Sequence, residues 1–586
     1  MCARAATTNC GTADVSALEF PGTMLSSTVS EVVHNLSAFA RWRAATLAPF
    51  KQRAFAVFWL ATVVSSFGSL IQTVGASWLM TTLAPSPLMI ALVQTAGALP
   101  FFFLSLVAGA LADIYDRRKL MLMAQLCMLS GASLLAYLTW AGQITPWLLL
   151  GFTFLMGAGS ATYAPVWQAS ISEQVARQYI PAAVTANALG FNFARSTGPA
   201  IGGVLVAAFG ATIAFVCNAA SYLGIVATLL WWKPAAKRAG LPPEPLGAAI
   251  ASGLRYVLLS PPLVAILVRC GAFTIAAASL QALMPVVARD LLGGGARTYG
   301  FLLGTFGIGA MAGALASALL RARYSSEALL RTMSVVSCVA AVGIGLSHWL
   351  IVTALLFALG GAVWMLGMSN FNIAAQLSSP RWVAGRAVAS YQTVAFGGFA
   401  LGSWIWGQVA HSFGVRSAMC AGGAAALVSL LISRRVRVRV AHHDGLDPHD
   451  AVSVASPQLD IQDSSGPIVV TVEYRVLPAN ATTFIAIVNE LGRIRRRDGA
   501  RNWSVCQDID NPELWTERFE SPTWLEHLRR QTRPTKSDQR VREKIATLVE
   551  GGRGAVRRHI GRPPGSEPLG VALRPIEAIA SIPLQN

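Results

Sequence analysis

Charged residues are scarce in this chain of 586 residues: they make up 13% of it, whereas hydrophobic residues make up 54%. A soluble globular domain carries about twice that charged share, so a string of ordinary soluble domains is excluded. Acidic residues are the scarcest. Only six acidic residues lie between Glu31 and Asp444: Asp113, Asp116, Glu173, Glu244, Asp290 and Glu327. All of them are expected in loops or at helix ends. If these helices cross a membrane, no carboxylate is expected at its centre.

Several signatures of chemistry are also missing. The eight cysteines include no C-x-x-C pair, and five lie in apolar stretches where a free cysteine acts as a small hydrophobe, so neither a disulfide framework nor a metal site is predicted. No phosphate-binding loop, dinucleotide fingerprint or nucleophile elbow is present, so we expect no cofactor and exclude ATP-driven pumping by this chain. Residues 1–46 are mixed and polar without a signal-peptide pattern, and we expect a disordered extension.

What is abundant is apolar sequence of membrane-spanning length. The external connections are very short, and a Pro-rich gap at 236–262, with an amphipathic stretch, divides the spans six and six. We therefore predict an all-α polytopic membrane protein with half-bundles at 47–235 and 263–440 and a cytoplasmic loop between them. The twelve predicted spans are 55–81, 86–110, 119–141, 146–170, 182–208, 212–232, 263–287, 299–320, 329–347, 350–376, 387–410 and 415–433.

Internal repetition supports this division. The segment Gly109-Ala110-Leu111-Ala112 ends the second span, and Gly313-Ala314-Leu315-Ala316 lies near the end of the eighth. Two parallel six-span halves follow, and such halves usually meet at a cavity near the midplane.

The net charge of +18 comes from the membrane region, where residues 41–440 hold 26 Lys and Arg against six acids. Twenty-one of these basic residues fall on one set of loops, and three, Arg289, Arg297 and Arg416, on the other. This positive-inside bias predicts that both termini are cytoplasmic. The lipid bilayer accounts for the basic charge, so no nucleic-acid partner is expected.

The character of the chain changes after Arg439. Residues 441–466 are rich in His, Asp, Ser and Gly and are predicted to be a linker. Residues 467–551 are predicted to be a small cytoplasmic α+β module of ferredoxin-like type, with strands at 468–476, 501–508 and 514–521 and helices at 480–496, 521–531 and 537–550. Residues 552–586 are expected to be disordered, and the module is a candidate for homodimer formation.

Two motifs resemble those of the major facilitator superfamily (MFS). The loop from Gly109 to Lys119 resembles its cytoplasmic gating signature, although Ile114 and Asp116 replace an Arg and a Gly of that pattern. The fifth span resembles its antiporter motif, in which glycines allow close helix contact and a proline allows a bend; a packing seam without a coupling role is the alternative. The matching residues are Gly109, Leu111, Asp113, Arg117 and Arg118 in the gating motif, and Asn187, Asn192, Arg195, Gly198, Pro199, Gly202 and Gly203 in the helix-bend motif.

Longer segments narrow the resemblance. Residues 164–203, 254–263, 288–300 and 383–392 are similar to the enterobactin-exporter branch of the superfamily, and 524–535 resembles antibiotic-biosynthesis monooxygenase domains. The resemblance implies a transporter of the bacterial inner membrane that exports a small amphipathic metabolite, siderophore-like or drug-like, by rocking two halves about a central site. Alternatives are a membrane-anchored enzyme, in which the tail acts as a monooxygenase with Trp503, Trp524 and His527, and a non-transporting receptor.

Charged and polar groups inside the spans are the candidates for the substrate pathway. Arg195 and Arg269 are the clearest, because a buried charge in a membrane is costly; the alternative for Arg269 is a snorkelling position. Two buried cations favour an anionic or phenolic substrate. The other candidates, for which helix-to-helix hydrogen bonding is the alternative, are Gln72, Tyr163, Trp167, Gln168, Gln281, Asn370, Asn372, Gln376, Tyr391 and Gln392.

Overall fold

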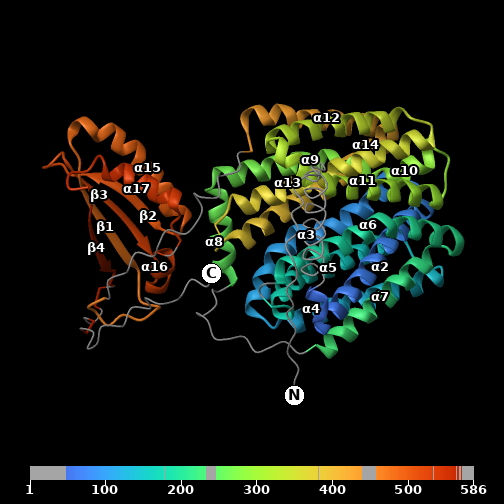
Figure 1. Cartoon of the computed structure of the whole chain (residues 1–586), viewed down its shortest axis with the longest axis horizontal. Helices are drawn as coiled ribbons and strands as arrows, with labels where there is room; N and C mark the ends of the chain where they lie inside the picture. The colour runs from blue at the N-terminus through green and yellow to red at the C-terminus, as the bar shows by residue number, and fades with distance from the viewer. Residues whose placement is uncertain are drawn as a thin grey trace, which may run out of the picture.

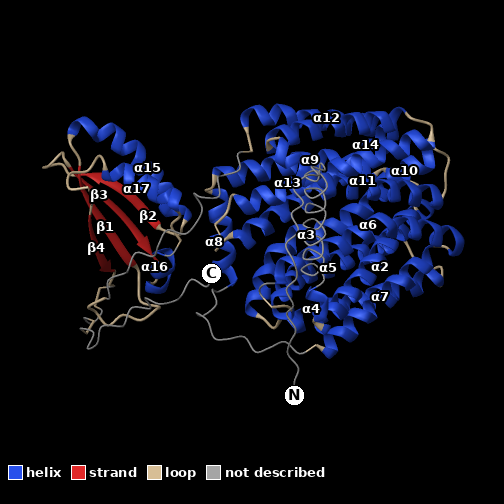
Figure 2. Ribbon diagram, in the orientation of Figure 1, coloured by secondary structure: helices blue, strands red, loops and turns tan. Residues whose placement is uncertain are grey.

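The computed structural model places a helical bundle beside a smaller α+β module (Figures 1 and 2). It describes residues 48–176, 179–232, 246–380, 382–438, 457–531, 533–552, 554–562, 564–565 and 569–570. The predicted extension at 1–46, most of the linker at 441–466 and most of the tail at 552–586 lie outside these residues.

The first half of the bundle consists of antiparallel helices joined by short turns. Their starts follow from local chemistry: Pro87 and Pro146 occupy first-turn positions, where the missing N–H is not needed. The Asp116 and Thr145 side chains cap the helices that follow them. The elements are η1 (Ala48–Lys51), α2 (Arg53–Leu83), α3 (Pro87–Ile114), α4 (Arg117–Trp140), α5 (Pro146–Gln174), α6 (Ile180–Phe209) and α7 (Ala211–Trp231).

The second half begins with a 13-residue helix, α8, inside the segment predicted to be an interhalf loop with an amphipathic stretch. Its longest element is α14, of 52 residues, which contains a non-helical residue, Gly414 (φ 83°). Positive φ is a conformation that glycine adopts at little cost. The elements are α8 (Leu246–Leu258), α9 (Pro261–Ala282), α10 (Met284–Val286), the π-helical η3 (Val287–Leu291), α11 (Ala296–Arg323), α12 (Ser326–Leu346), α13 (Leu350–Leu377) and α14 (Ala384–Arg435).

Ten helices in the described part of the chain are long and apolar enough to cross a membrane. This agrees with the prediction of a mostly helical membrane protein. The 30-residue α6 is not one of the ten, and α14 counts once although it changes direction at Gly414.

The two halves meet along two helix pairs, α3 with α14 and α6 with α11. In the six-span repeat these pairs are equivalent, since α3 and α11 carry the two copies of the repeated segment. The α6–α11 contact is close enough that a Cβ added at Gly203 would lie 2.5 Å from the Cα of Gly300. Glycine is therefore required for these helices to approach one another as they do.

The halves are joined most firmly at one end of the bundle, here called the turn end, which holds the α2–α3 turn and the α9–α11 connection. One apolar core there contains residues of both halves, whereas the clusters toward the other end belong to one half each. Arg289 Nη2 donates to the Pro85 carbonyl at 2.9 Å, and Ser86 Oγ lies 3.3 Å from His411 Nδ1. The end opposite carries the basic loops and is called the basic end.

The module is a four-stranded antiparallel sheet, in the order β2-β3-β1-β4, with helices on one face (Figure 2). The predicted strands and helices between 468 and 546 are confirmed within a few residues. The elements are β1 (Ile468–Arg475), η5 (Pro478–Asn480), α15 (Ala481–Arg497), β2 (Arg501–Gln507), β3 (Leu514–Ser521), α16 (Trp524–Gln531), α17 (Lys536–Ala546) and β4 (Ala555–Ile560).

Strand β4 corrects one predicted boundary, because it lies in the segment 552–586 that we expected to be disordered. It pairs with β1 from Ile468↔Ile560 to Glu473↔Ala555. Its sequence is mostly exposed and carries two arginines and a histidine, so it lacks the apolar alternation that signals a strand. The segment forms a strand because its backbone pairs with the edge of β1, and this pairing is not apparent from the sequence of the segment.

The module contacts the bundle at its basic end. The Arg497 guanidinium lies 4.8 Å from the Tyr256 ring centre on α8, and that of Arg533 lies 4.6 Å from the Trp382 ring centre. The two rings touch edge to face at 5.3 Å. Such cation–ring contacts contribute on the order of 1 kcal/mol each, so they attach the module to the second half.

Candidate functional site

The helix-bend motif of α6 lies at the boundary between the two halves. A Cβ on Gly198 or Gly202 would meet α2, whereas one on Gly203 would meet the backbone of α11. The same helix therefore contacts both halves, with Pro199 inside it. Arg195 is one turn earlier, and its carbonyl approaches Gly307 of α11.

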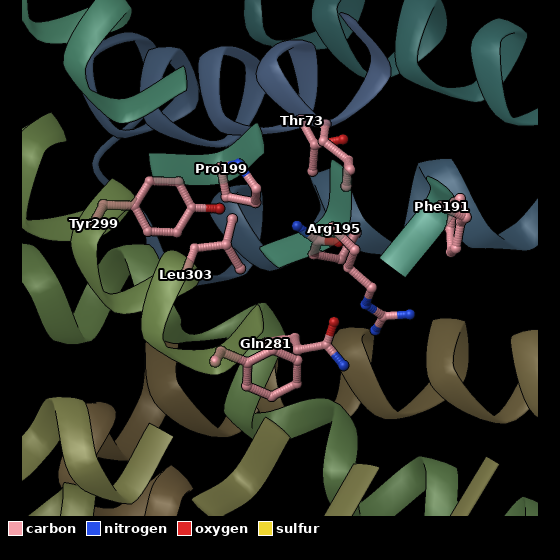
Figure 3. A pocket seen from close by; sticks show the side chains of 10 residues that line it. Thr73, Phe191, Arg195, Pro199, Gln281, Tyr299 and Leu303 are labelled. Carbon is pink, nitrogen blue, oxygen red and sulfur yellow. The ribbon is translucent and has the colours of Figure 1, made fainter. Parts of the chain in front are cut away.

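A cavity of about 120 Å³ lies at this boundary (Figure 3). Its wall comes from α2, α3 and α6 of the first half and α9 and α11 of the second, so a molecule inside it touches both. The lining residues are Leu70, Thr73, Gln94, Phe191, Arg195, Pro199, Gln281, Tyr299, Leu303 and Phe306.

Among the described lining residues, Arg195 is the one that carries a charge. Figure 3 shows its guanidinium extending toward the part of the cavity where the Gln281 amide lies. No described side chain forms an ion pair or a hydrogen bond with it, and Gln281 Nε2 also has no partner among the described residues. Two donors are thus available to a ligand. The neighbouring Gln94 is engaged, since its Nε2 donates to Ser77 Oγ at 3.3 Å.

Most of the other predicted pathway residues of the first half lie away from this cavity. Gln72 is 6% exposed and accepts from Asn218 Nδ2 inside the half-bundle. Tyr163 stacks on Trp167 at 6.3 Å, and its hydroxyl has no partner among the described residues. Gln168 is exposed.

The second-half candidates are also mostly engaged with their own half. Asn370 Nδ2 donates to the Ser326 carbonyl at 3.3 Å, and Tyr391 Oη donates to the Met368 carbonyl at 3.0 Å. Asn372 and Gln376 bond to each other. Gln392 is partly buried and outside the cavity lining. Of the candidates, Arg195, with Pro199 of the bend motif, and Gln281 line the cavity.

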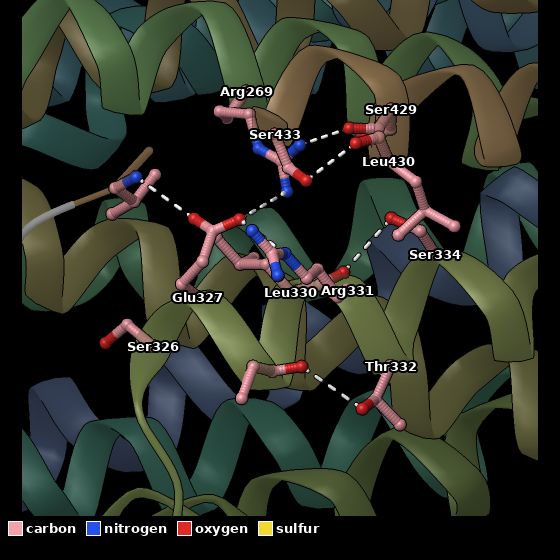
Figure 4. A network of polar contacts seen from close by, with 12 residues as sticks. Arg269, Ser326, Glu327, Leu330, Arg331, Thr332, Ser334, Ser429, Leu430 and Ser433 are labelled. Atoms are coloured by element: carbon pink, nitrogen blue, oxygen red, sulfur yellow. Dashed lines mark hydrogen bonds and ion pairs between the residues drawn. The ribbon is translucent and has the colours of Figure 1, made fainter. Parts of the chain in front are cut away.

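Arg269, expected beside Arg195 as a cavity cation or at a snorkelling position, is 1% exposed inside the second half and lines no part of this cavity (Figure 4). Its Nη1 donates to the Ser429 carbonyl, and its Nη2 lies 3.8 Å from Glu327 Oε1. Glu327 also accepts from Arg331 Nε at 3.1 Å and from the Val438 N–H at 3.0 Å. The carboxylate therefore joins α9 and α12 to the chain that follows α14.

The gating motif forms a polar cluster at the basic end. Asp116, which departs from the family pattern, caps α4 by accepting from the Arg118 N–H at 2.9 Å. Arg117 Nη1 bonds Glu173 Oε1 at 2.8 Å, and Arg118 donates to the carbonyls of Leu229 and Leu230 at the end of α7, both at 2.7 Å. Glu173 therefore compensates Arg117 and not Arg195.

The surroundings of three motif residues, Gly109, Asp113 and Asn192, lie outside the described part of the structure. Leu111 contributes its carbonyl, which accepts from the Tyr115 N–H at 2.9 Å, and Asn187 Nδ2 is buried without a partner among the described residues.

Sequence reasoning missed Thr73, Gln94 and Tyr299. Gln94 is a polar residue in an apolar span, the signal that selected Gln72, and Tyr299 lies within a segment similar to known exporters. Tyr299 stacks on Trp78 at 6.4 Å across the two halves. Contacts between halves depend on how the two bundles dock, which the spacing within one helix does not report.

The fold and this site define a membrane transporter built from two helical halves around a central cavity. The chain belongs to the MFS family described as transmembrane secretion effectors, whose family model matches residues 44–562. That match includes the whole module, from β1 to β4, as well as the bundle.

Similar proteins support the same class. The chain is 28% identical over 174 residues to the staphyloferrin A transporter of Staphylococcus aureus. The aligned region covers 30% of this chain and 43% of that protein. It is 24% identical over 115 residues to macrolide efflux protein A of Streptococcus pyogenes, covering 20% of this chain and 28% of that one. The matches thus span less than half the length of these relatives.

Solved structures share the fold. A bacterial homologue of the human lysosomal transporter Spinster, in an inward-facing and unoccupied conformation, aligns with a TM-score of 0.55 at 14% identity, over 66% of this chain and 98% of that one. An auto-inhibited POT family peptide transporter aligns with the same TM-score at 15% identity, over 67% and 98%.

Proposed function

We propose that this protein is a secondary active transporter that exports a small amphipathic anion across the bacterial inner membrane by alternating access. The observation that carries the proposal is the guanidinium of Arg195, which faces the cavity between the halves without an ion partner among the described residues. A cation in such a place is costly unless something compensates it. A transported carboxylate or phenolate supplies that charge, whereas a cationic molecule is repelled.

The topology of the proposal has twelve spans and cytoplasmic termini. Adding α6 and counting α14 as two segments divided at Gly414 brings the ten apolar helices to twelve. The basic loops lie at the end of the bundle where the module is attached, which supports a cytoplasmic location for that end. The element order of the module supports the ferredoxin-like arrangement.

The proposed substrate is siderophore-like. This is supported by the relative named for staphyloferrin A, by the resemblance of residues 164–203 to the enterobactin-exporter branch, and by the positive cavity. Direction also rests on this resemblance. Drug-like efflux, suggested by the relative named for macrolides, is the second candidate and applies to uncharged or anionic drugs.

For the module we propose an assembly or regulatory role, with pairing of modules from two chains as one form of it. An enzymatic role is disfavoured by geometry. His527 is fully buried, and Trp503 Nε1 donates to the buried Glu517 at 2.9 Å, so neither is available to a reacting molecule in this structure.

Transport by inside-out membrane vesicles tests the proposal. We expect vesicles with the unaltered protein to accumulate at least one member of a panel of catecholate and hydroxycarboxylate siderophores, and no lipophilic cation. Arg195→Ala should lower that transport by about 10- to 100-fold, because a hydrogen bond to a charged group contributes about 1.5–3 kcal/mol. Arg195→Lys should retain part of it, because the charge persists without the forked donor geometry.

The matched control is Arg416→Gln, which removes an exposed arginine that contacts His348 at the turn end. It should transport normally, and all variants should reach similar membrane levels. Full transport by Arg195→Ala would show that Arg195 serves packing or snorkelling and would end the anion proposal.

A further inference from the structure

The interior of the module is unusually rich in charged groups. Alternate residues of β3, namely Trp515, Glu517 and Phe519, face the helices, and Glu517 is fully buried. Arginines from three helices enter the same space: Arg495 from α15, Arg530 from α16 and Arg542 from α17. A small α+β module needs only apolar side chains there, so these groups call for an explanation.

Glu517 is fully used by its neighbours. It accepts from Tyr474 Oη at 2.9 Å, from Trp503 Nε1 at 2.9 Å and from Arg495 Nε at 3.3 Å. Burial raises the pKa of Glu517, but Arg495 and these donors lower it further, so that it lies below its usual value. The carboxylate is therefore ionised and compensates one arginine, Arg495.

Arg530 has no comparable partner. Its side chain is 5% exposed, and its guanidinium lies 4.3 Å from the centre of the Phe519 ring, as that of Arg495 does at 4.5 Å. Nη2 lies 3.3 Å from His527 Nδ1, but Nη1 has no hydrogen-bond partner in the part of the chain that the structure describes. Burial and then Arg495 lower the pKa of Arg530 to about 9.

Arg542 is in a similar position, since its buried Nε also has no partner among the described residues. The nearby acids are engaged elsewhere: Asp498 and Asp538 bind Arg497 at 2.9 and 2.7 Å. With Arg497 included, four buried or partly buried arginines share three carboxylates among the described residues, Glu517, Asp498 and Asp538, which leaves a surplus of one positive charge. An unpaired buried charge is strongly destabilising, and the unsatisfied guanidinium atoms among the described residues, Arg530 Nη1 and Arg542 Nε, are both donors.

We propose that this interior is a binding site for a small oxyanion, a carboxylate or phosphate group, with Arg530 as its main ligand and Arg542 assisting. The group accepts the free N–H of Arg530 and compensates the surplus positive charge between the sheet and the helices. His527, neutral and hydrogen-bonded to Arg530 Nη2, holds the guanidinium in place. The site is separate from the cavity around Arg195 and does not depend on what the bundle transports.

Hydrogen exchange of the full chain tests this site, with sodium citrate, sodium phosphate and sodium chloride compared at matched ionic strength. We expect citrate or phosphate to slow exchange of amides in residues 514–531, by about tenfold when the free anion is at ten times its Kd. Chloride should not slow this exchange. Protection by citrate indicates a carboxylate ligand, and protection by phosphate indicates a phosphate ligand. Equal exchange of the unaltered protein in all three salts would overturn the proposal.

Variants locate the effect. Arg530→Gln should abolish the protection and Arg542→Gln should weaken it, whereas Arg557→Gln, which removes an exposed arginine of β4 with a side chain 65% exposed, should leave it unchanged. Amides of β1 report whether each variant is folded in chloride. Protection that persists in a folded Arg530→Gln variant would also overturn the proposal. If that variant unfolds, the comparison of the three salts on the unaltered protein still tests the proposal.

Discussion

At the scale of single residues, Arg195 and Arg269 show that partners decide what a membrane arginine does. Both lie in apolar spans, and the sequence makes both candidates for the cavity, with a snorkelling position as the alternative for Arg269. Arg269 has Glu327 at 3.8 Å and the Ser429 carbonyl, so its charge is compensated inside one half. Arg195 has no such partner among the described residues and lines the cavity between halves. The compensated arginine contributes to structure, and the uncompensated one is available to a ligand.

His527 makes the stability of the module dependent on pH. Burial and then Arg530 lower the pKa of His527 from 6.5 to about 3, so between these values the unfolded chain binds a proton that the folded module does not. Stability is therefore lost as the pH falls below 6.5, by up to about 1.4 kcal/mol per pH unit. We therefore expect the melting temperature of the module to decrease when the pH is lowered from 7.5 to 5. The transition of the module is identified as the one that is lost when the chain is truncated after Val438.

The charged groups around His527 are Arg530 on its own helix, Arg495 on α15 and Arg558 on β4, all cations that oppose its protonation. His527→Gln should therefore flatten the pH dependence, whereas His559→Gln, which replaces an exposed histidine of β4, should preserve it. An equally steep dependence in His527→Gln would assign it to other groups.

At the scale of elements, α6 and α11 hold the halves together through glycine. A Cβ on Gly203 would lie 2.5 Å from the Cα of Gly300, and one on Gly307 would lie 2.6 Å from the Arg195 carbonyl. These atoms are backbone, so the clash cannot be relieved by a side-chain rotation. The helices must separate if either glycine is replaced.

We therefore predict that Gly203→Ala disfavours closure of the turn end. Overpacking costs about 1–3 kcal/mol, so the equilibrium should shift by about 5- to 100-fold toward a state open at that end. A cysteine introduced at Thr73, in the cavity wall, should then react faster with a membrane-impermeant thiol reagent added outside. The chain without that cysteine provides the background.

Gly151→Ala is the matched control, because a Cβ there meets nothing within 4 Å in the described structure. It should label like the unaltered protein. Unchanged labelling of Gly203→Ala would mean that α6 and α11 can separate without opening the cavity.

At the scale of the whole molecule, the module and the basic loops share one end of the bundle. Arg497 and Arg533 contact Tyr256 and Trp382, which belong to α8 and to the turn before α14. Both contact points lie on the second half, so the module is carried by that half in any motion of one half against the other.

This arrangement predicts where reporters are active. A reporter fused after Arg439 should be active only if it is one that functions in the cytoplasm, because the sequence predicts 21 basic loop residues on that side. The same reporters inserted at Gln143, in an exposed turn between α4 and α5, should show the opposite pattern. Periplasmic activity after Arg439 would contradict the twelve-span topology.

Local patterns were sufficient for individual elements. The alternation in β1 predicted a strand, and the cap and apolar spacing at 521–531 predicted α16, since both depend on neighbours in sequence. Strand β4 was missed because its sequence has no apolar alternation, and its strand conformation depends on pairing with β1. Likewise, Asp116 was identified as a departure from the family motif, but only the structure shows that its side chain caps α4.

The sequence by itself determined that this is a polytopic membrane protein with two related halves, a basic end and a small α+β module, because hydropathy, charge bias and periodicity are properties of contiguous segments. Only the tertiary structure decided that Arg195 and Gln281 share a cavity while Arg269 pairs with Glu327, and that Arg530 is buried without a carboxylate. Those outcomes depend on which side chains from distant segments come into contact when the helices pack. A buried charge that contacts an opposite charge is compensated within the protein, whereas one without such a contact is available to a ligand.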